Sequence, residues 1–236
     1  MKIALIGYGK MGKAIEQMAT KKGHTIITRI DTIDSPERKK IKDADVAIEF
    51  SQPDSVVNNL EACFDAQVPV VCGTTGWLAH KSNIEASCQQ KGGTFFYASN
   101  FSLGVNILLK VNEYLAQIMD QYPDYDVSID EIHHTQKKDA PSGTAITLAE
   151  GVIAHLKRKH RWVNKDNSNH EELVINSFRE DPAPGTHTIK YSSPIDNLEI
   201  KHIAHSRDGF VLGAILVAEW IQGKKGVLGM SDFLKL

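Results

Sequence analysis

The stretch KIALIGYGKMG, residues 2–12, decides the fold that this sequence predicts. KIALIG is a short and nearly continuous apolar run, which is typical of a strand buried on both faces. Gly7, Gly9 and Gly12 follow with GxGxxG spacing, and KMGKAIEQMATKKG then shows the apolar periodicity of a helix. A strand, a glycine turn and a helix in this order predict the start of a dinucleotide-binding domain.

The glycine turn has the features that an anion site needs. Gly7 permits a tight turn, Gly9 lets the backbone approach a pyrophosphate, and Gly12 lets the helix pack closely on the strand. The free N–H groups and the helix dipole would then hold the phosphates, with Lys10 and Lys13 adding positive charge. The alternative is a glycine turn that binds nothing. We expect the cofactor to contact the whole turn, namely Gly7, Tyr8, Gly9, Lys10, Met11 and Gly12.

An acidic residue stands where the cofactor's ribose is expected. Asp31 ends the predicted second strand, TIITRID, at about the 20-residue spacing typical of such domains. A carboxylate there accepts hydrogen bonds from the ribose hydroxyls and repels a 2′-phosphate, which favours NADH. Arg29 and the nearby lysines leave room for NADPH. We therefore predict NADH or NADPH as the cofactor, with NADH slightly favoured.

Strand-like and helix-like segments alternate through residues 1–100. DVAIEF, VPVVCGT and TFFYAS read as further strands, separated by the helical segments SVVNNLEACFDAQ and SNIEASCQQKGG. This alternation predicts a Rossmann-like α/β fold, a doubly wound parallel sheet with helices on both faces. CGTTGW (72–77) and ASNFS (98–102) end two of the strands, where ligands of open parallel sheets bind. They would suit a nicotinamide ribose, or they are ordinary turns.

The pattern changes after Asn100. VNILLKVNEYLAQIMDQY (105–122) and PSGTAITLAEGVIAHLKRKH (141–160) have helical periodicity, whereas DVSIDEIHH, ELVINSFRE, GTHTIKYSS and NLEIKHIAHS read as strands with short connections. This predicts a second domain of α+β type with a mainly antiparallel sheet. The last apolar segment, FVLGAILVAEWI (210–221), predicts a helix that must be covered, and packing on the first domain would cover it.

The segment EIHHTQKKDAPSGTA, residues 131–145, concentrates titratable groups. Alternation along DVSIDEIHH places Glu131 and His133 on one face, together with Val127 and Ile129. Pro141 precedes a helix, so the Ser-Gly-Thr sequence after it lies at a helix N-terminus, which is a ready site for a carboxylate. The alternative is a solvated loop followed by a helix cap.

The chemistry that such a segment supports is proton donation during a reduction. A hydride delivered to an unsaturated carbon leaves negative charge on the neighbouring atom, and a nearby acid must quench it. A lysine ammonium or a protonated histidine can do so, and either group also attracts a dianionic substrate.

Composition limits the remaining possibilities. The formal net charge is −2, which gives no indication of a nucleic-acid or membrane partner. Three cysteines without CxxC spacing indicate a reducing compartment, and the N-terminus lacks the features of a signal peptide, so we expect a cytoplasmic protein. The other histidines show no reliable metal-ligand spacing, and we expect no metal site.

Taken together, these motifs resemble the 4-hydroxy-tetrahydrodipicolinate reductase family, also called dihydrodipicolinate reductases. The similarity rests on EIHHTQKKDAPSGTA and on GYGKMG, CGTTG, ASNFSLGVN and HIAHSRDGF in the same order, and it covers essentially the whole chain. Thr135 and Gln136 stand where many relatives carry basic residues, and the glycine turn is one residue shorter than the usual GxxGxMG.

The resemblance implies an activity and an organisation. The family reduces a cyclic 4-hydroxy imine dicarboxylate with NADH or NADPH, with loss of water, in lysine (diaminopimelate) biosynthesis. It implies a dinucleotide-binding domain split into residues 1–101 and 209–236, with a substrate-binding and oligomerisation domain at 102–208, in a homotetramer. Two other functions remain open on the residues alone: a different Rossmann-type dehydrogenase acting on an amino or oxo acid, and a non-catalytic NADH-binding sensor.

The resemblance also assigns roles by position. His133 matches the proton donor or acceptor, and Lys137 matches the proton-donating lysine. The substrate-carboxylate contacts match His134, Gly143 and Thr144. Besides the glycine turn and Asp31, the dinucleotide site matches Gly73, Thr74, Thr75, Ala98, Ser99, Asn100 and Phe101.

Overall fold

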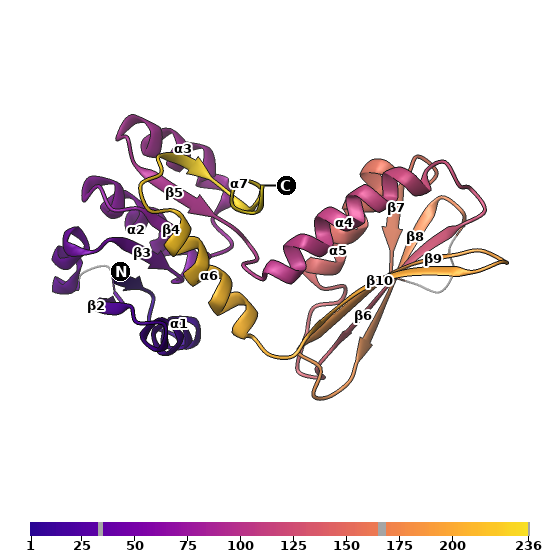
Figure 1. Ribbon diagram of the computed structural model, residues 1–236, viewed down its shortest axis with the longest axis horizontal. Helices are drawn as coiled ribbons and strands as arrows, with labels where there is room; N and C mark the ends of the chain where they lie inside the picture. The colour runs from indigo at the N-terminus through magenta and orange to yellow at the C-terminus, as the bar shows by residue number, and fades with distance from the viewer. Residues whose placement is uncertain (33–34, 165–168, 236) are drawn as a thin grey trace. The chain divides into compact units, whose positions relative to one another are not determined.

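The chain forms two compact domains in the computed structural model, which describes residues 1–32, 35–164 and 169–235 (Figure 1). The first domain comprises Met1–Ser102 and Asp208–Leu236, and the second comprises Leu103–Arg207. The second domain is therefore inserted into the first, and the chain returns to complete the first domain after the second has been made.

The first domain contains a six-stranded parallel sheet in the order β11-β5-β4-β3-β1-β2. The order reverses between β1 and β3, which makes their carboxyl ends the expected binding edge. The five predicted strands are confirmed, whereas β11 is a three-residue strand that the sequence analysis missed. The strands are β1 (Lys2–Ile6), β2 (Thr25–Ile30), β3 (Val46–Glu49), β4 (Val70–Cys72), β5 (Thr94–Tyr97) and β11 (Gly226–Leu228).

Helices cover both faces of this sheet, as predicted. The helices α1 (Lys10–Lys21) and α6 (Asp208–Trp220) share a buried apolar cluster with β1, β3 and β5. The helices α2 (Pro53–Asp65) and α3 (Lys81–Gln90) contribute to the second cluster. The apolar helix predicted near the end of the chain is α6, and Gly213 lets it approach closely, since a Cβ there would lie 1.8 Å from the carbonyl oxygen of Phe101. None of the described helices combines the length and hydropathy needed to cross a membrane.

Three short elements of the first domain were not predicted. They are the 3-10 helices η1 (Pro36–Asp43) and η2 (Leu78–His80) and the final helix α7 (Met230–Leu234). Each is too short or too polar to give a clear hydrophobic period.

The second domain is of α+β type, as predicted, but its five-stranded sheet is mixed. The sheet order is β10-β9-β6-β8-β7, with β6 pairing antiparallel to β9 and parallel to β8. The sequence spacing made β8 and β9 look like neighbours, yet β6 lies between them. The strands are β6 (Asp126–His133), β7 (Arg161–Val163), β8 (Glu172–Arg179), β9 (Gly185–Ser192) and β10 (Asn197–Ala204).

The helices α4 (Leu103–Met119) and α5 (Gly143–His155) share the domain's apolar cluster with one face of this sheet. The predicted alternation along β6 is confirmed, because Val127, Ile129, Glu131 and His133 are all buried. The first two pack in the apolar core, while the last two place a carboxylate and an imidazole at the end of the same face. At the end of β6, Glu131 and His133 therefore form part of the polar site of the second domain.

Candidate active site

The glycine turn of the first domain connects the end of β1 to α1. Gly7 has a φ of +88°, and a Cβ there would lie 2.0 Å from the carbonyl oxygen of Phe50. A Cβ on Gly12 would lie 2.3 Å from the carbonyl oxygen of Gly7. Gly9, in contrast, has no atom of the described residues within 4 Å of the position a Cβ would take. Two of the glycines therefore serve close packing, and the middle one borders open space before α1, where a phosphate could approach.

Asp31 lies against this turn. The backbone N–H of Tyr8 donates to its Oδ1 at 3.2 Å, so the end of β2 is tied to the glycine turn. Arg29 is paired with the carboxylate of Glu16, and its guanidinium lies 5.7 Å from the centre of the Tyr8 ring. Hydrogen bonds from Arg29 and then from Tyr8 lower the pKa of Glu16 to about 2. Arg29, which left room for NADPH in the sequence analysis, is thus already paired with a carboxylate.

A buried carboxylate supports the loop after β4. Glu49, at the end of β3, accepts hydrogen bonds from Thr74 Oγ1 at 2.7 Å, from Asn59 Nδ2 at 3.3 Å and from Ser51 Oγ. Thr74 in turn accepts the backbone N–H of Ser51 at 2.8 Å. Cys72 adds a thiol contact at 3.2 Å. This network fixes the loop at the sheet edge where ligands of such folds bind.

The other residues predicted to contact the cofactor follow β4 and β5. A Cβ on Gly73 would overlap the Phe50 ring, and Phe50 packs on Phe101 with ring centres 5.5 Å apart. Ala98 is tied to β4 by a hydrogen bond from its N–H to the Cys72 carbonyl at 3.3 Å. Asn100 accepts the backbone N–H of Ser102 at 2.9 Å through its side chain. Thr75 and Ser99 are exposed.

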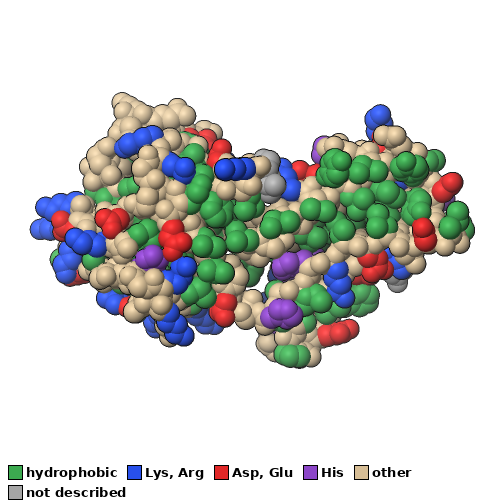
Figure 2. All heavy atoms as spheres, in the orientation of Figure 1, with side chains coloured by type: hydrophobic (Ala, Val, Ile, Leu, Met, Phe, Trp, Pro, Cys, Tyr) green, Lys and Arg blue, Asp and Glu red, His purple; other side chains and the backbone are tan. Residues whose placement is uncertain are grey.

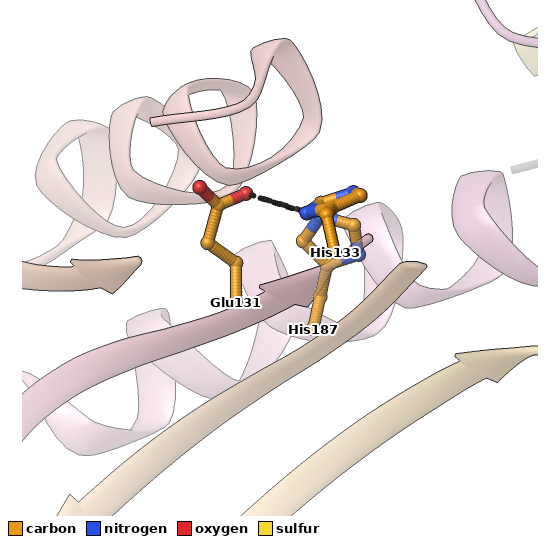
Figure 3. Close-up of side chains that lie close together, drawn as sticks. All are labelled: Glu131, His133 and His187. Carbon is orange, nitrogen blue, oxygen red and sulfur yellow. Dashed lines mark ion pairs between the residues drawn. The ribbon is translucent and has the colours of Figure 1, made fainter. Parts of the chain in front are cut away.

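In the second domain, a carboxylate and two imidazoles meet at the end of β6 (Figure 3). Oε2 of Glu131 lies 3.2 Å from Nδ1 of His133 and 4.0 Å from Nε2 of His187. The two imidazole rings make an edge contact, with centres 5.1 Å apart. All three side chains are buried, and Glu131 is fully so. Sequence analysis missed His187, because it comes from β9 and only strand pairing places it opposite Glu131.

The electrostatics of this group favour an ionised carboxylate and a neutral second imidazole. Burial alone would raise the pKa of Glu131, but the adjacent His133 imidazole, together with hydrogen bonds from Ser142 and Ser177, holds it well below its usual value. Burial, followed by the nearby charge of His133, lowers the pKa of His187 from 6.5 to about 4. His187 is therefore uncharged at neutral pH, and its Nε2 lies 3.1 Å from the hydroxyl of Ser142.

The start of α5 presents free backbone donors. Ser142 is the N-cap, and its Oγ accepts the N–H of Ala145 at 3.2 Å. Its own N–H donates to both oxygens of Glu131, at 3.0 and 3.1 Å. Within the described part of the chain, the N–H groups of Gly143 and Thr144 have no hydrogen-bond partner. Gly143 is exposed, and a Cβ there would meet no described atom within 4 Å, so an anion could approach this helix N-terminus.

The loop between β6 and α5 holds the predicted lysine. Lys137 Nζ lies 2.8 Å from the exposed carboxylate of Asp139, and that pairing lowers the pKa of Asp139. The charge of Lys137 also contributes to the lowered pKa of His187. His134, at the end of the strand, is half-buried. Thr135 donates from its N–H and its hydroxyl to Asp181, at 3.1 and 2.6 Å.

Glu131, His133 and His187 also carry side chains that commonly bind metal ions. Their ligand atoms lie within 4.8 Å of one another. However, both oxygens of Glu131 already accept the Ser142 N–H, and the guanidinium of Arg179 lies 3.5 Å from Oε1. A cation beside Arg179 would be repelled, which favours a hydrogen-bonded cluster over a metal centre.

Comparison with known proteins identifies the family. The family model for the N-terminus of dihydrodipicolinate reductase matches residues 1–101, and the model for its C-terminus matches residues 104–234. The chain belongs to the dihydrodipicolinate reductase family. A relative from Christiangramia forsetii, named 4-hydroxy-tetrahydrodipicolinate reductase, is 44% identical over 99% of this chain and 98% of its own length. One of the same name from Nitratiruptor sp. is 33% identical over 91% of this chain and 83% of its own length.

Solved structures support the family's fold. A dipicolinate-bound dihydrodipicolinate reductase from Paenisporosarcina sp. matches with a TM-score of 0.79, covering 99% of both chains at 20% identity. An amine dehydrogenase from Mycobacterium smegmatis matches with a TM-score of 0.59 at 10% identity, covering 97% of this chain and 94% of that one. At these identities the two structures indicate a shared fold only. The resemblance found in the sequence to the dihydrodipicolinate reductase family is thus confirmed.

Proposed function

We propose that this chain catalyses the NAD(P)H-dependent reduction of (2S,4S)-4-hydroxy-2,3,4,5-tetrahydrodipicolinate to tetrahydrodipicolinate in lysine (diaminopimelate) biosynthesis. The observation that carries this proposal is the match over nearly the full length to relatives named for that activity. In the balanced reaction one hydride and one proton enter the substrate, the 4-hydroxyl group leaves as water, and NAD(P)⁺ is released. When bound, NAD(P)H supplies the hydride.

We propose that each of the two domains binds one of the two reactants. The first domain would hold the dinucleotide at the glycine turn, Asp31 and the loops after β4 and β5. The second domain would hold the substrate. We propose NADH as the better cofactor, because Asp31 repels a 2′-phosphate and Arg29 is engaged with Glu16.

The second domain would bind and protonate the dicarboxylate. The unpartnered N–H groups of Gly143 and Thr144 suit one substrate carboxylate, with His134 as a further contact. His133 and Lys137 are the proposed proton donors, and the positive charge of Lys137 also favours a dianion. The partners of the protein would then be a small dicarboxylate and the cofactor, and we propose that it works as a homotetramer in the cytoplasm.

A coupled assay tests the proposal. Pyruvate, aspartate semialdehyde and the synthase that condenses them generate the substrate in place, and NADH absorbance is followed with and without this protein. We expect NADH consumption that depends on the protein and on the synthase. Turnover with another amino or oxo acid, but none with this substrate, would favour a different dehydrogenase. NADH binding without any turnover would favour a sensor.

A further inference from the structure

Glu131 lies beneath both parts of the site in the second domain. Its two oxygens accept the N–H of Ser142, at 3.0 and 3.1 Å, and one of them lies 3.2 Å from Nδ1 of His133. We propose that Glu131 is a positioning residue for the reduction: it fixes the His133 imidazole and the start of α5 relative to each other. This inference rests on the proposed function, since it gives the substrate's proton donor and its carboxylate site one common support.

The contact with Ser142 explains how Glu131 sets the anion site. Ser142 is the N-cap of α5, so its position determines where the next two N–H groups point. Those groups belong to Gly143 and Thr144, which have no partner among the described residues. A carboxylate that holds the N-cap therefore orients the two free donors that follow it.

The contact with His133 explains how Glu131 orients the His133 imidazole. His133 is 7% exposed, and its Nδ1 has no hydrogen-bond partner of good geometry among the described residues. The Glu131 carboxylate, at 3.2 Å, is thus the charged group that orients this nitrogen. On the other side of the ring there is little space, because a Cβ on Gly185 would come within 3.1 Å of Nε2. The ring is held between the carboxylate and the backbone of β9.

The surroundings keep the carboxylate itself in place. Arg179 reaches it from β8, at 3.5 Å, and also donates to the carbonyl oxygen of Asp139 at 2.6 Å. His187 faces it from β9, with its Nε2 4.0 Å from Oε2 of Glu131. A fully buried carboxylate is costly, and an apolar side chain would fill the same space at lower cost. Its presence at the point where the two parts of the site meet indicates a role in function.

Two variants separate the two contacts, and a third serves as a matched control. Glu131→Gln keeps an oxygen for the Ser142 N–H but removes the charge beside His133, so we expect kcat to fall by about 10-fold or more with the substrate KM within about 3-fold. Glu131→Ala removes both contacts, and we expect a similar loss of kcat together with a rise in KM of about 10-fold. Asp130→Asn changes the neighbouring carboxylate on the opposite face of β6 and should leave both constants unchanged. NADH affinity, measured by fluorescence, should be the same in all three variants.

Two measurements do not depend on turnover. Affinity for dipicolinate, measured by calorimetry, should fall by about 10-fold in Glu131→Ala and change little in Glu131→Gln. The imidazole ¹⁵N spectrum should show altered His133 signals in Glu131→Gln and unaltered ones in Asp130→Asn.

The outcomes separate the inference from the proposed function. An active wild-type protein whose Glu131→Gln variant keeps full kcat and unaltered His133 signals would overturn the inference and leave the proposed function standing. Parallel loss of activity, NADH affinity and melting temperature in both Glu131 variants would show a merely structural role, and so overturn the inference as well. A wild-type protein that neither consumes the substrate nor binds dipicolinate would overturn the proposed function and, with it, the inference.

Discussion

Lys137 carries the most specific chemical expectation of any single side chain in this protein. Its ammonium lies 2.8 Å from Asp139, an exposed partner that can release it at little cost, because exposed ion pairs contribute about 0–1 kcal/mol. It is followed at once by Lys138, which is exposed. The two neighbouring lysines therefore offer a comparison in which only one of them is assigned to the reaction.

We expect Lys137→Ala to lower kcat by about 100-fold or more, in the range typical of general acids, while NADH affinity stays within a factor of about two. Lys138→Ala should behave like the wild-type protein in both respects. Steady-state kinetics and fluorescence titration with NADH measure these quantities. An equal loss of kcat in both variants would indicate that the reaction depends on the total positive charge of the loop and not on Lys137 itself.

Asp31 allows a second prediction at the same scale. Replacing it with serine removes the charge that opposes a 2′-phosphate, although Arg29 remains paired with Glu16. The ratio of kcat/KM for NADPH to that for NADH should therefore rise by about 10-fold, since one repulsive charge is worth about 1.4 kcal/mol in a partly exposed site. An unchanged ratio would show that cofactor choice does not depend on this residue.

At the scale of elements, β9 contributes a histidine whose titration affects folding. The folded-state pKa of His187 is depressed to about 4 from an ordinary value of 6.5, so the unfolded chain binds a proton more readily between these values. Stability is therefore fully present above pH 6.5 and declines as the pH falls toward 4, by up to about 3 kcal/mol.

His187→Asn should reduce this loss of stability between pH 6.5 and 4. Urea unfolding of both proteins at several pH values measures it. The carboxylate of Glu131 also titrates in acid: because its folded-state pKa is lowered, its contribution to stability is lost as the pH falls from the usual glutamate range downward, which is mostly below the window of His187. An identical pH dependence in the two proteins would mean that another group is responsible.

The same strands show what the sequence could and could not predict. The alternation along β6 is a local property, so its buried face and the pairing of Glu131 with His133 on that face follow from a period of two. The position of His187 depends on the pairing of β9 with β6, and that of Arg179 on the pairing of β8 with β6. Short connections suggested that β8 and β9 are neighbours. The helix α5, which carries the chain across the sheet, makes β6 and β8 parallel neighbours instead.

For the whole molecule, the surface of the second domain bears on the proposed homotetramer. All the exposed large hydrophobic residues of the described chain except Leu78 and Leu212 lie in this domain, and Figure 2 shows extensive hydrophobic surface there. Phe178 and Ile203 are 46% and 50% exposed. They project from the face of the five-stranded sheet opposite to Ile175 and His202, and so away from the apolar cluster shared with α4 and α5. Such surfaces usually mark interfaces.

We expect light scattering after gel filtration to give four times the mass of the chain. Phe178→Glu combined with Ile203→Glu should give a smaller species, because charges on an apolar interface oppose association. Leu78→Glu, an equally drastic change on the first domain, should leave the mass unchanged. A smaller mass for the Leu78 variant alone would place the proposed interface on the first domain.

The return of the chain to its first domain has a consequence for biosynthesis. The ribosome releases β1–β5 early, but α6 and β11, which complete that sheet and its apolar cover, emerge only near the end of translation. Until then, β5 is an open sheet edge next to uncovered aromatic side chains, a state in which nascent polypeptides bind chaperones or aggregate. The inserted domain has all its strands by residue 204 and can mature first, so the half that starts the polypeptide is the half that finishes folding last.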